Sequence, residues 1–120
     1  MSKTILVVDD NPDAREMVSY ILVKEGFSVV TAGDGEAALD LVKKQTPDLI
    51  VTDIQMPKLD GIEMIKRLRD QFMSRRVPIV VMSSFGSGAI QAAMDAGANK
   101  STPKPMAVEY FLKIVRQLLG

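Results

Sequence analysis

The chain has 120 residues, 47% hydrophobic and 25% charged, which is ordinary for one globular domain and excludes disordered and fibrous classes. Fifteen basic residues balance fifteen acidic ones, so charge gives no reason to expect direct binding to nucleic acid or to an anionic membrane. Without Cys or His, the chain contains no disulfide, thiolate nucleophile, Ser-His-Asp triad or Cys/His zinc site, and any metal must be held by oxygen. Its apolar runs are too short for a membrane span or a signal peptide, so we expect a cytoplasmic protein.

The first apolar run, Thr4 to Val8, predicts a strand, and it ends in the acidic pair Asp9-Asp10. Asn11-Pro12 is typical of a helix N-cap followed by proline at the first helical position. The helix should continue to Gly26, a good residue for the position just past a helix. Its apolar residues repeat at helical spacing: Ala14, Met17, Val18, Ile21 and Leu22.

Phe27 to Ala32 predicts a second strand, and Asp34-Gly35 should open a short helix whose buried side carries Ala38, Leu41 and Val42. Leu49 to Val51 is a short run of the kind found in strands buried on both faces, and Asp53 follows where this strand meets a loop. Asp60 is a plausible N-cap for the next helix, whose apolar residues are Ile62, Ile65, Leu68 and Phe72.

Pro78 to Met82 predicts the fourth strand, which ends in Ser83-Ser84. An Ala-rich helix should follow over Gly86 to Ala96, with Ile90, Ala93 and Met94 on its buried side. Asn99 to Thr102 would form a fifth strand, before Pro103-Lys104-Pro105. The last segment is an amphipathic helix with a core stripe of Val108, Phe111, Leu112, Val115 and Leu119.

Five strands that alternate with five helices predict an α/β fold, a doubly wound (βα)5 parallel sheet over residues 1–120. The strand order 2-1-3-4-5 of flavodoxin-like folds places the first and third strands side by side. Asp9, Asp10 and Asp53 would then share one edge of the sheet, flanked by Ser83 and Lys104.

Three carboxylates in one shallow site either hinder one another's ionisation or collect a cation, and Mg²⁺ is the hard cation that oxygen ligands suit. A carboxylate beside that cation can act as a nucleophile and form an aspartyl phosphate. Lys104 adds a second positive charge and Ser83 a hydroxyl donor for a phosphoryl oxygen. Taken singly, Asp10 could simply cap a helix, Ser83 close a strand and Lys104 be a solvated lysine. Their convergence on one edge favours chemistry.

Five short motifs resemble those of the receiver domains of two-component response regulators, and the resemblance spans essentially the whole chain. They are LVVDD at 6–10, DIQMPKLDG at 53–61, PIVVMSS at 78–84, GA at 97–98 and KP at 104–105. The resemblance implies a two-component phosphorelay protein in which Asp53 accepts a phosphoryl group from a histidine kinase or a histidine phosphotransfer protein. A downstream effector protein or output domain would read the result.

By the same resemblance, Asp10, Asp53 and the backbone carbonyl of Gln55 would ligate Mg²⁺, and Asp9 would act through a metal-bound water. Ser83 would be the switch hydroxyl and Lys104 the lysine that contacts the phosphate. The Lys104-Pro105 bond would be cis. Such a domain is not an enzyme, except that it catalyses its own phosphorylation and dephosphorylation.

The chain departs from the family pattern in the last predicted strand, where Ser101 replaces the usual Tyr or Phe switch residue and Pro103 is unusual. We expect a smaller shift between states as a result, with Phe85 partly substituting. A second apolar stripe on the last helix, Met106, Tyr110 and Ile114, lies beside a stretch, 84–94, that carries no charge. We expect partners to bind there, or a second copy to form a homodimer through the last two helices.

Two other classes compete with this interpretation. A pseudo-receiver would bind partners without being phosphorylated, although the complete set of acids, hydroxyl and lysine argues against it. An enzyme or carrier would be a flavodoxin-like FMN protein or an aspartate-nucleophile phosphatase. The acidic residues between Asp9 and Asp13 would repel the phosphate of FMN, and Asp53-Ile54-Gln55 lacks the second acid of such phosphatases.

Overall fold

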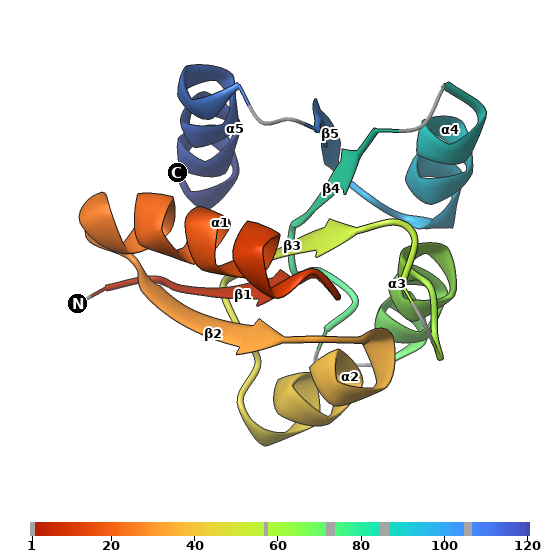
Figure 1. Ribbon diagram of the computed structural model, residues 1–120. Coiled ribbons are helices and arrows are strands. Elements are labelled where there is room, and N and C mark those ends of the chain that lie inside the picture. The colour runs from red at the N-terminus through yellow and green to blue at the C-terminus, as the bar shows by residue number, and fades with distance from the viewer. Residues whose placement is uncertain (1, 57, 72–73, 85–86, 105–106) are drawn as a thin grey trace.

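The computed structural model describes residues 2–56, 58–71, 74–84, 87–104 and 107–120 (Figure 1). Five parallel strands form one sheet in the order β2-β1-β3-β4-β5, as the alternating pattern predicted. The strands are β1 (Thr4–Val8), β2 (Ser28–Ala32), β3 (Leu49–Asp53), β4 (Ile79–Ser83) and β5 (Lys100–Pro103). Each observed boundary lies within a residue or two of its predicted position, and β3 continues as far as Asp53 itself.

Five helices cover the two faces of the sheet, and their bounds are α1 (Pro12–Lys24), α2 (Gly35–Lys44), α3 (Gly61–Asp70), α4 (Ser87–Ala96) and α5 (Val108–Leu119). Helices α1 and α5 pack on one face, and α2, α3 and α4 pack on the other (Figure 1). None of these helices, within the part of the chain that the structure describes, is long and apolar enough to span a bilayer.

Alternate residues of the central strands supply the two halves of the core. Ile5 and Val7 of β1 face α1 and α5, whereas Leu6 and Val8 face α2 and α3. All five residues of β3 are buried, as expected of a central parallel strand covered on both sides. Because the core fixes every strand of the sheet, it also fixes the edge at which the strands end.

Helices α1 and α3 each begin at a residue whose side chain caps the helix. Asn11 Oδ1 accepts hydrogen bonds from the amides of Asp13 (2.9 Å) and Ala14 (3.1 Å), as its position before Pro12 predicted. Asp60 Oδ1 accepts one from the Glu63 amide (2.9 Å), so that predicted cap is also confirmed. These caps fix the directions in which α1 and α3 leave the edge of the sheet.

Some core predictions for the helices were wrong. Met17 of α1 is 50% exposed, because the helix packs on the sheet through Val18 and Leu22, one turn apart. In α2, Leu39 is buried and Leu41 is only half-buried, since the buried arc is centred one position away from the predicted one.

The arc that α5 buries also differs from the prediction. Val108 was predicted in the core stripe but is 43% exposed. Ile114 was predicted in the second, exposed stripe but is buried, while Tyr110 of that stripe is exposed. Several predictions concern residues outside the described part of the chain: Phe72, Phe85, Met106 and the Lys104-Pro105 peptide bond.

Candidate functional site

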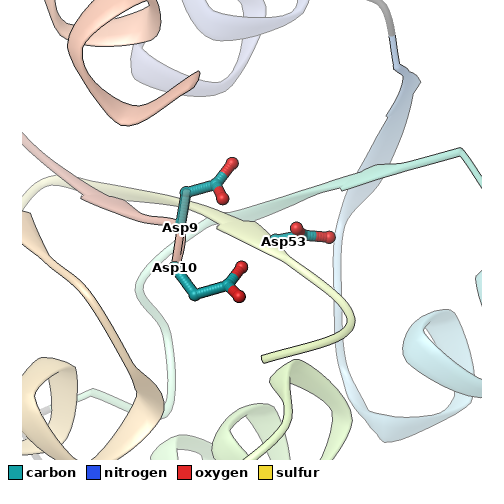
Figure 2. A group of neighbouring side chains, drawn as sticks. All are labelled: Asp9, Asp10 and Asp53. Atoms are coloured by element: carbon teal, nitrogen blue, oxygen red, sulfur yellow. The ribbon is translucent and has the colours of Figure 1, made fainter. Parts of the chain in front are cut away.

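The candidate site lies at the carboxyl edge of the sheet, where β1, β3, β4 and β5 end. Asp9 and Asp10 follow β1, and Asp53 is the last residue of β3 (Figure 2). Ser83 is the last residue of β4, and Lys104 follows β5. The parallel register brings these ends together, because neighbouring strands stop within one or two residues of each other. Ligands of open α/β sheets bind at such an edge.

Three carboxylates meet at the centre of the site, as the strand order predicted. One oxygen each from Asp9, Asp10 and Asp53 lies within 4.8 Å of the other two. Asp9 is fully buried and Asp53 is 8% exposed, whereas Asp10 faces solvent. Negative charges this close and this desolvated repel strongly, and a divalent cation held by oxygen would relieve the repulsion. The donor set therefore fits Mg²⁺.

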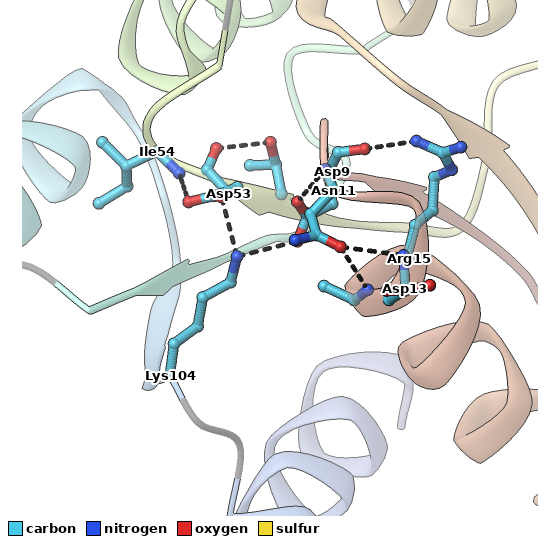
Figure 3. Close-up of polar contacts among 9 residues, drawn as sticks. Asp9, Asn11, Asp13, Arg15, Asp53, Ile54 and Lys104 are labelled. Carbon is cyan, nitrogen blue, oxygen red and sulfur yellow. Dashed lines mark hydrogen bonds and ion pairs between the residues drawn. The ribbon is translucent and has the colours of Figure 1, made fainter.

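Lys104 supplies positive charge to two of these carboxylates. Its Nζ lies 2.8 Å from Asp53 Oδ2 and 2.9 Å from Asp9 Oδ2 (Figure 3). Burial alone lowers the pKa of Lys104, but its hydrogen bonds to Asp53 and Asp9 and their charges outweigh burial and raise the pKa. The Lys104 amide also donates to the carbonyl of Ser83 (3.1 Å), which joins the loop after β5 to the end of β4.

Different residues contact the carboxylate and the main-chain carbonyl of Asp53. Oδ1 accepts a hydrogen bond from the Ile54 amide (2.7 Å), while Oδ2 accepts from Lys104. The Thr52 hydroxyl donates to the Asp53 carbonyl (2.9 Å). A side chain at Gly61 would bring its Cβ to 2.3 Å from that same carbonyl, so only glycine fits there. Neither the Thr52 contact nor the close approach of Gly61 was predicted, since both depend on how the loop folds back.

Hydrogen bonds also fix the loop that carries Asp9 and Asp10. The amide of Asp9 donates to the carbonyl of Ala32 (3.2 Å), and the Asn11 amide donates to Asp9 Oδ1 (2.9 Å). Arg15 Nη1, on the second turn of α1, donates to the main-chain carbonyl of Asp9 (2.7 Å). The role of Arg15 was not predicted, because a contact from a side chain to a main-chain carbonyl leaves no pattern in the sequence.

The remaining predicted residues lie around this centre. Ser83 is buried, at 3% exposure, and Gln55 is exposed on the loop after β3. Gln55 lines an open cleft of about 460 Å³ together with Asp10, Met56 and Asp60. The exposed acid Asp10 lines this cleft, so the site is open to solvent on that side.

Comparison with known proteins agrees with this geometry. Residues 5–116 match the model of the response regulator receiver domain. Response regulator MprA from Mycobacterium bovis and from Mycobacterium tuberculosis is 42% identical over 120 residues, which cover 99% of this chain and 51% of MprA. The chain thus spans about half the length of the curated relatives it matches.

Solved structures superpose closely on the whole fold. A putative response regulator from Chloroflexus aurantiacus is 31% identical, with a TM-score of 0.96 and coverage of 99% and 98% of the two chains. CheY4 of Vibrio cholerae is 32% identical, with a TM-score of 0.93 and coverage of 99% and 100%. The receiver domain of sensor histidine kinase PA1611 from Pseudomonas aeruginosa, described with magnesium in its active-site cleft, is 29% identical, with a TM-score of 0.94 and coverage of 100% and 99%. The sequence motifs, the fold and the acidic edge therefore agree, and this chain belongs to the response regulator receiver domain family.

Proposed function

We propose that this receiver domain is a phosphorylation-gated signalling module. In this proposal Asp53 accepts a phosphoryl group from a histidine kinase or a histidine phosphotransfer protein, and the domain signals through contacts with an effector protein or output domain. The observation that carries the proposal is the placement of Asp53, whose carboxylate lies within 4.8 Å of two other carboxylates and 2.8 Å from Lys104 Nζ. Response regulators act with histidine kinases and output domains, and this arrangement supports the same role here.

Asp10, Asp53 and the backbone carbonyl of Gln55 would hold Mg²⁺, with Asp9 acting through a water molecule. When bound, Mg²⁺ neutralises charge on the oxygens of the phosphoryl group. Asp9 and Asp53 are desolvated by the core, so they gain more from a cation than exposed acids would. Asp10 is the exposed member of the set and faces the cleft from which a cation enters.

In the transfer step, a carboxylate oxygen of Asp53 attacks phosphorus, a new O–P bond forms, and the N–P bond to the donor histidine breaks. The electron pair of that N–P bond leaves with the imidazole of the donor. Lys104 then balances charge on the phosphoryl oxygens, and the Ser83 hydroxyl donates a hydrogen bond to one of them. Catalysis by the chain would be limited to its own phosphorylation and dephosphorylation, and the proposed location is the cytoplasm.

Signal output is proposed to leave through α4, β5 and α5, which we call the output face. Val108 and Tyr110 are 43% and 49% exposed on α5, and α4 has no charged residue before Asp95. Partners or a second copy of the chain would bind this face, and direct binding to nucleic acid is not proposed. Ser83, at the end of β4, would connect the phosphoryl group to the chain leading into α4.

Acetyl phosphate treatment followed by mass spectrometry tests the assignment of Asp53. With Mg²⁺ we expect one phosphoryl adduct on the native chain and on the control Asp40→Ala, which removes an exposed acid of α2. We expect none on Asp53→Ala and little in excess chelator. An adduct that persists in Asp53→Ala would reject the site. A native chain that takes no phosphoryl group with Mg²⁺ would instead identify a pseudo-receiver scaffold.

A further inference from the structure

The peptide group that joins Asp9 to Asp10 is held from outside the acidic cluster. Arg15 Nη1 donates to its carbonyl oxygen at 2.7 Å (Figure 3). A peptide group is planar, so a bond that fixes this oxygen also fixes the orientation of the Asp10 amide and the path to the Asp10 α-carbon. The guanidinium therefore acts on the backbone from which the Asp10 side chain projects.

Asp10 depends on that backbone more than the other two acids do. Asp9 accepts hydrogen bonds from Asn11 and Lys104, and Asp53 accepts them from Ile54 and Lys104. Within the described part of the chain, the exposed Asp10 carboxylate has no hydrogen bond or ion pair to direct it. Its direction toward the other two carboxylates is set by its main chain and its own rotamer.

Arg15 is itself confined, which a residue that positions another must be. It lies on α1 just after the Asn11 cap, and its amide donates to the carbonyl of Asn11 (3.0 Å). The half-buried guanidinium passes close to Gly33, where an added Cβ would lie 3.3 Å from Nη1. The loop after β2 therefore bounds the guanidinium on one side.

We propose that Arg15 is a positioning residue that aligns Asp10 for binding of the divalent cation. This inference rests on the proposed function, since it assumes that the acidic cluster takes Mg²⁺. Geometry and charge predict opposite effects when Arg15 is removed. A guanidinium repels a cation, so charge alone predicts tighter Mg²⁺ binding after its loss. Loss of alignment predicts weaker binding, because Asp10 would sample directions away from the site.

Mg²⁺ titration by calorimetry separates the two effects in the native chain, Arg15→Met, Arg15→Lys and Lys58→Met. Lys58→Met is the charge control, since Lys58 lies on the exposed loop after β3 and, among the described residues, forms an ion pair with Asp34 at 3.7 Å. For Arg15→Met we expect binding weaker by about 10-fold, the low end for loss of a group that orients a metal ligand. Arg15→Lys should lose less Mg²⁺ affinity, because the lysine ammonium can still donate to the Asp9 carbonyl. Lys58→Met should be unchanged or slightly tighter.

Amide NMR of the metal-free proteins gives a readout that does not require Mg²⁺. The Asp10 nitrogen belongs to the same peptide group as the Asp9 carbonyl, so Arg15→Met should shift the Asp10 amide more than any amide of α3. An Asp10 amide that does not shift would show that Arg15 does not hold this peptide group in solution. If Arg15→Met does not fold, as judged by circular dichroism in chelator, Arg15→Lys replaces it: the charge is retained, so charge alone predicts unchanged Mg²⁺ binding, and lost alignment predicts weaker binding.

The inference is overturned if Arg15→Met and Arg15→Lys bind Mg²⁺ as tightly as the native chain, or more tightly. That result would leave the proposed function intact, because the native chain would still bind the cation and accept phosphate. A native chain that shows no Mg²⁺ binding would reject both proposals at once.

Discussion

Lys104 Nζ lies 2.8 Å from Asp53 Oδ2, so an ion pair joins the end of the central strand to a residue 51 positions later in the chain. The same ammonium reaches Asp9, which is fully buried. One ammonium thus pairs with two of the three carboxylates in the metal-free protein. Stability and metal binding at this edge should therefore be coupled.

Replacing Lys104 with Met should destabilise the metal-free protein and make its stability depend more on Mg²⁺. The substitution leaves two desolvated carboxylates without their ammonium partner. Breaking a fully buried ion pair typically costs about 3–5 kcal/mol of stability. The cost here should be smaller, because the Lys104 side chain is 25% exposed. Thermal unfolding in chelator and in Mg²⁺ measures both effects. Equal Mg²⁺-induced stabilisation in Lys104→Met and the native chain would contradict the coupling.

The pH dependence of the same ion pair has a definite sign. The pKa of Lys104 is raised in the folded protein, and an unfolded lysine has a pKa of about 10.4. The stabilisation is thus fully present below pH about 10.4 and is lost as pH rises through the higher folded pKa. Denaturant unfolding of metal-free protein from pH 9 upward should show a loss that Lys104→Met lacks.

Asp10 and Asp13 lie on one short segment but should differ in their effect on Mg²⁺. Asp10→Asn should weaken binding by at least about 10-fold, since even groups that only orient a metal ligand contribute that much. Asp13 is an exposed acid in the first turn of α1, where its negative charge interacts favourably with the positive end of the helix dipole. Asp13→Asn should leave the affinity nearly unchanged. Equal affinities for the two variants in calorimetric titration would count against the metal site.

Gly61→Ala should disturb the site through the main chain of Asp53. The new methyl group would meet the Asp53 carbonyl at 2.3 Å, and overpacking of this kind costs about 1–3 kcal/mol. Gly88 of α4 is the matched control, because a Cβ there meets nothing within 4 Å. Gly88→Ala should stabilise the protein by about 0.5–1 kcal/mol, as expected for alanine in a helix. Urea unfolding gives both values, and two changes of the same sign would refute the contact argument.

Replacing each of two buried threonines with valine should change the stability of the fold in opposite directions. Thr102 of β5 is 2% exposed, and its hydroxyl has no hydrogen-bond partner among the described residues. Thr102→Val should stabilise the fold by about 1 kcal/mol, because burying an unpaired hydroxyl is unfavourable. Thr52 donates to the Asp53 carbonyl, so Thr52→Val should cost about 1 kcal/mol. Thermal unfolding of both variants checks the signs, and a destabilised Thr102→Val would indicate that the hydroxyl is paired.

Four of the five strands could be predicted because each is a short apolar run near a turn signal, whereas β5 is polar and was placed by the alternation of strands and helices. Asn11 and Asp60 could be predicted as caps because capping depends on local spacing. The acids Asp9, Asp10 and Asp53 could be brought to one edge by topology alone. These features depend on the chain's local pattern or on strand order.

Features that depend on how two segments approach each other could not be predicted. Nothing in the sequence places the Gly61 α-carbon against the Asp53 carbonyl, or the Arg15 guanidinium against Asp9. In α5, apolar residues occur almost all around the helix, so the pattern does not define which arc faces the sheet. Packing against β3 and β5 selects Ile114 rather than Val108.

The last prediction concerns the output face and the serine at position 101. Ser101 is half-buried on β5 and pairs in register with Val81 of β4, so it lies beside the strand that ends at Ser83. Where receivers usually carry an aromatic residue, a serine has too little surface to couple the site to α4 and α5. Phosphorylation should then bias two preexisting states only modestly.

Amide NMR with Mg²⁺ and beryllofluoride, a phosphoryl mimic, should therefore show shifts around Asp53 and Ser83 and smaller shifts along α4, β5 and α5. Ser101→Tyr should enlarge the changes on the output face, while the control Lys100→Ala, an exposed residue of the same strand, should not. Sedimentation of the same samples would show whether the chain forms a dimer. Changes that stay confined to the loops around Asp53 in both the native chain and Ser101→Tyr would show that the output lies elsewhere.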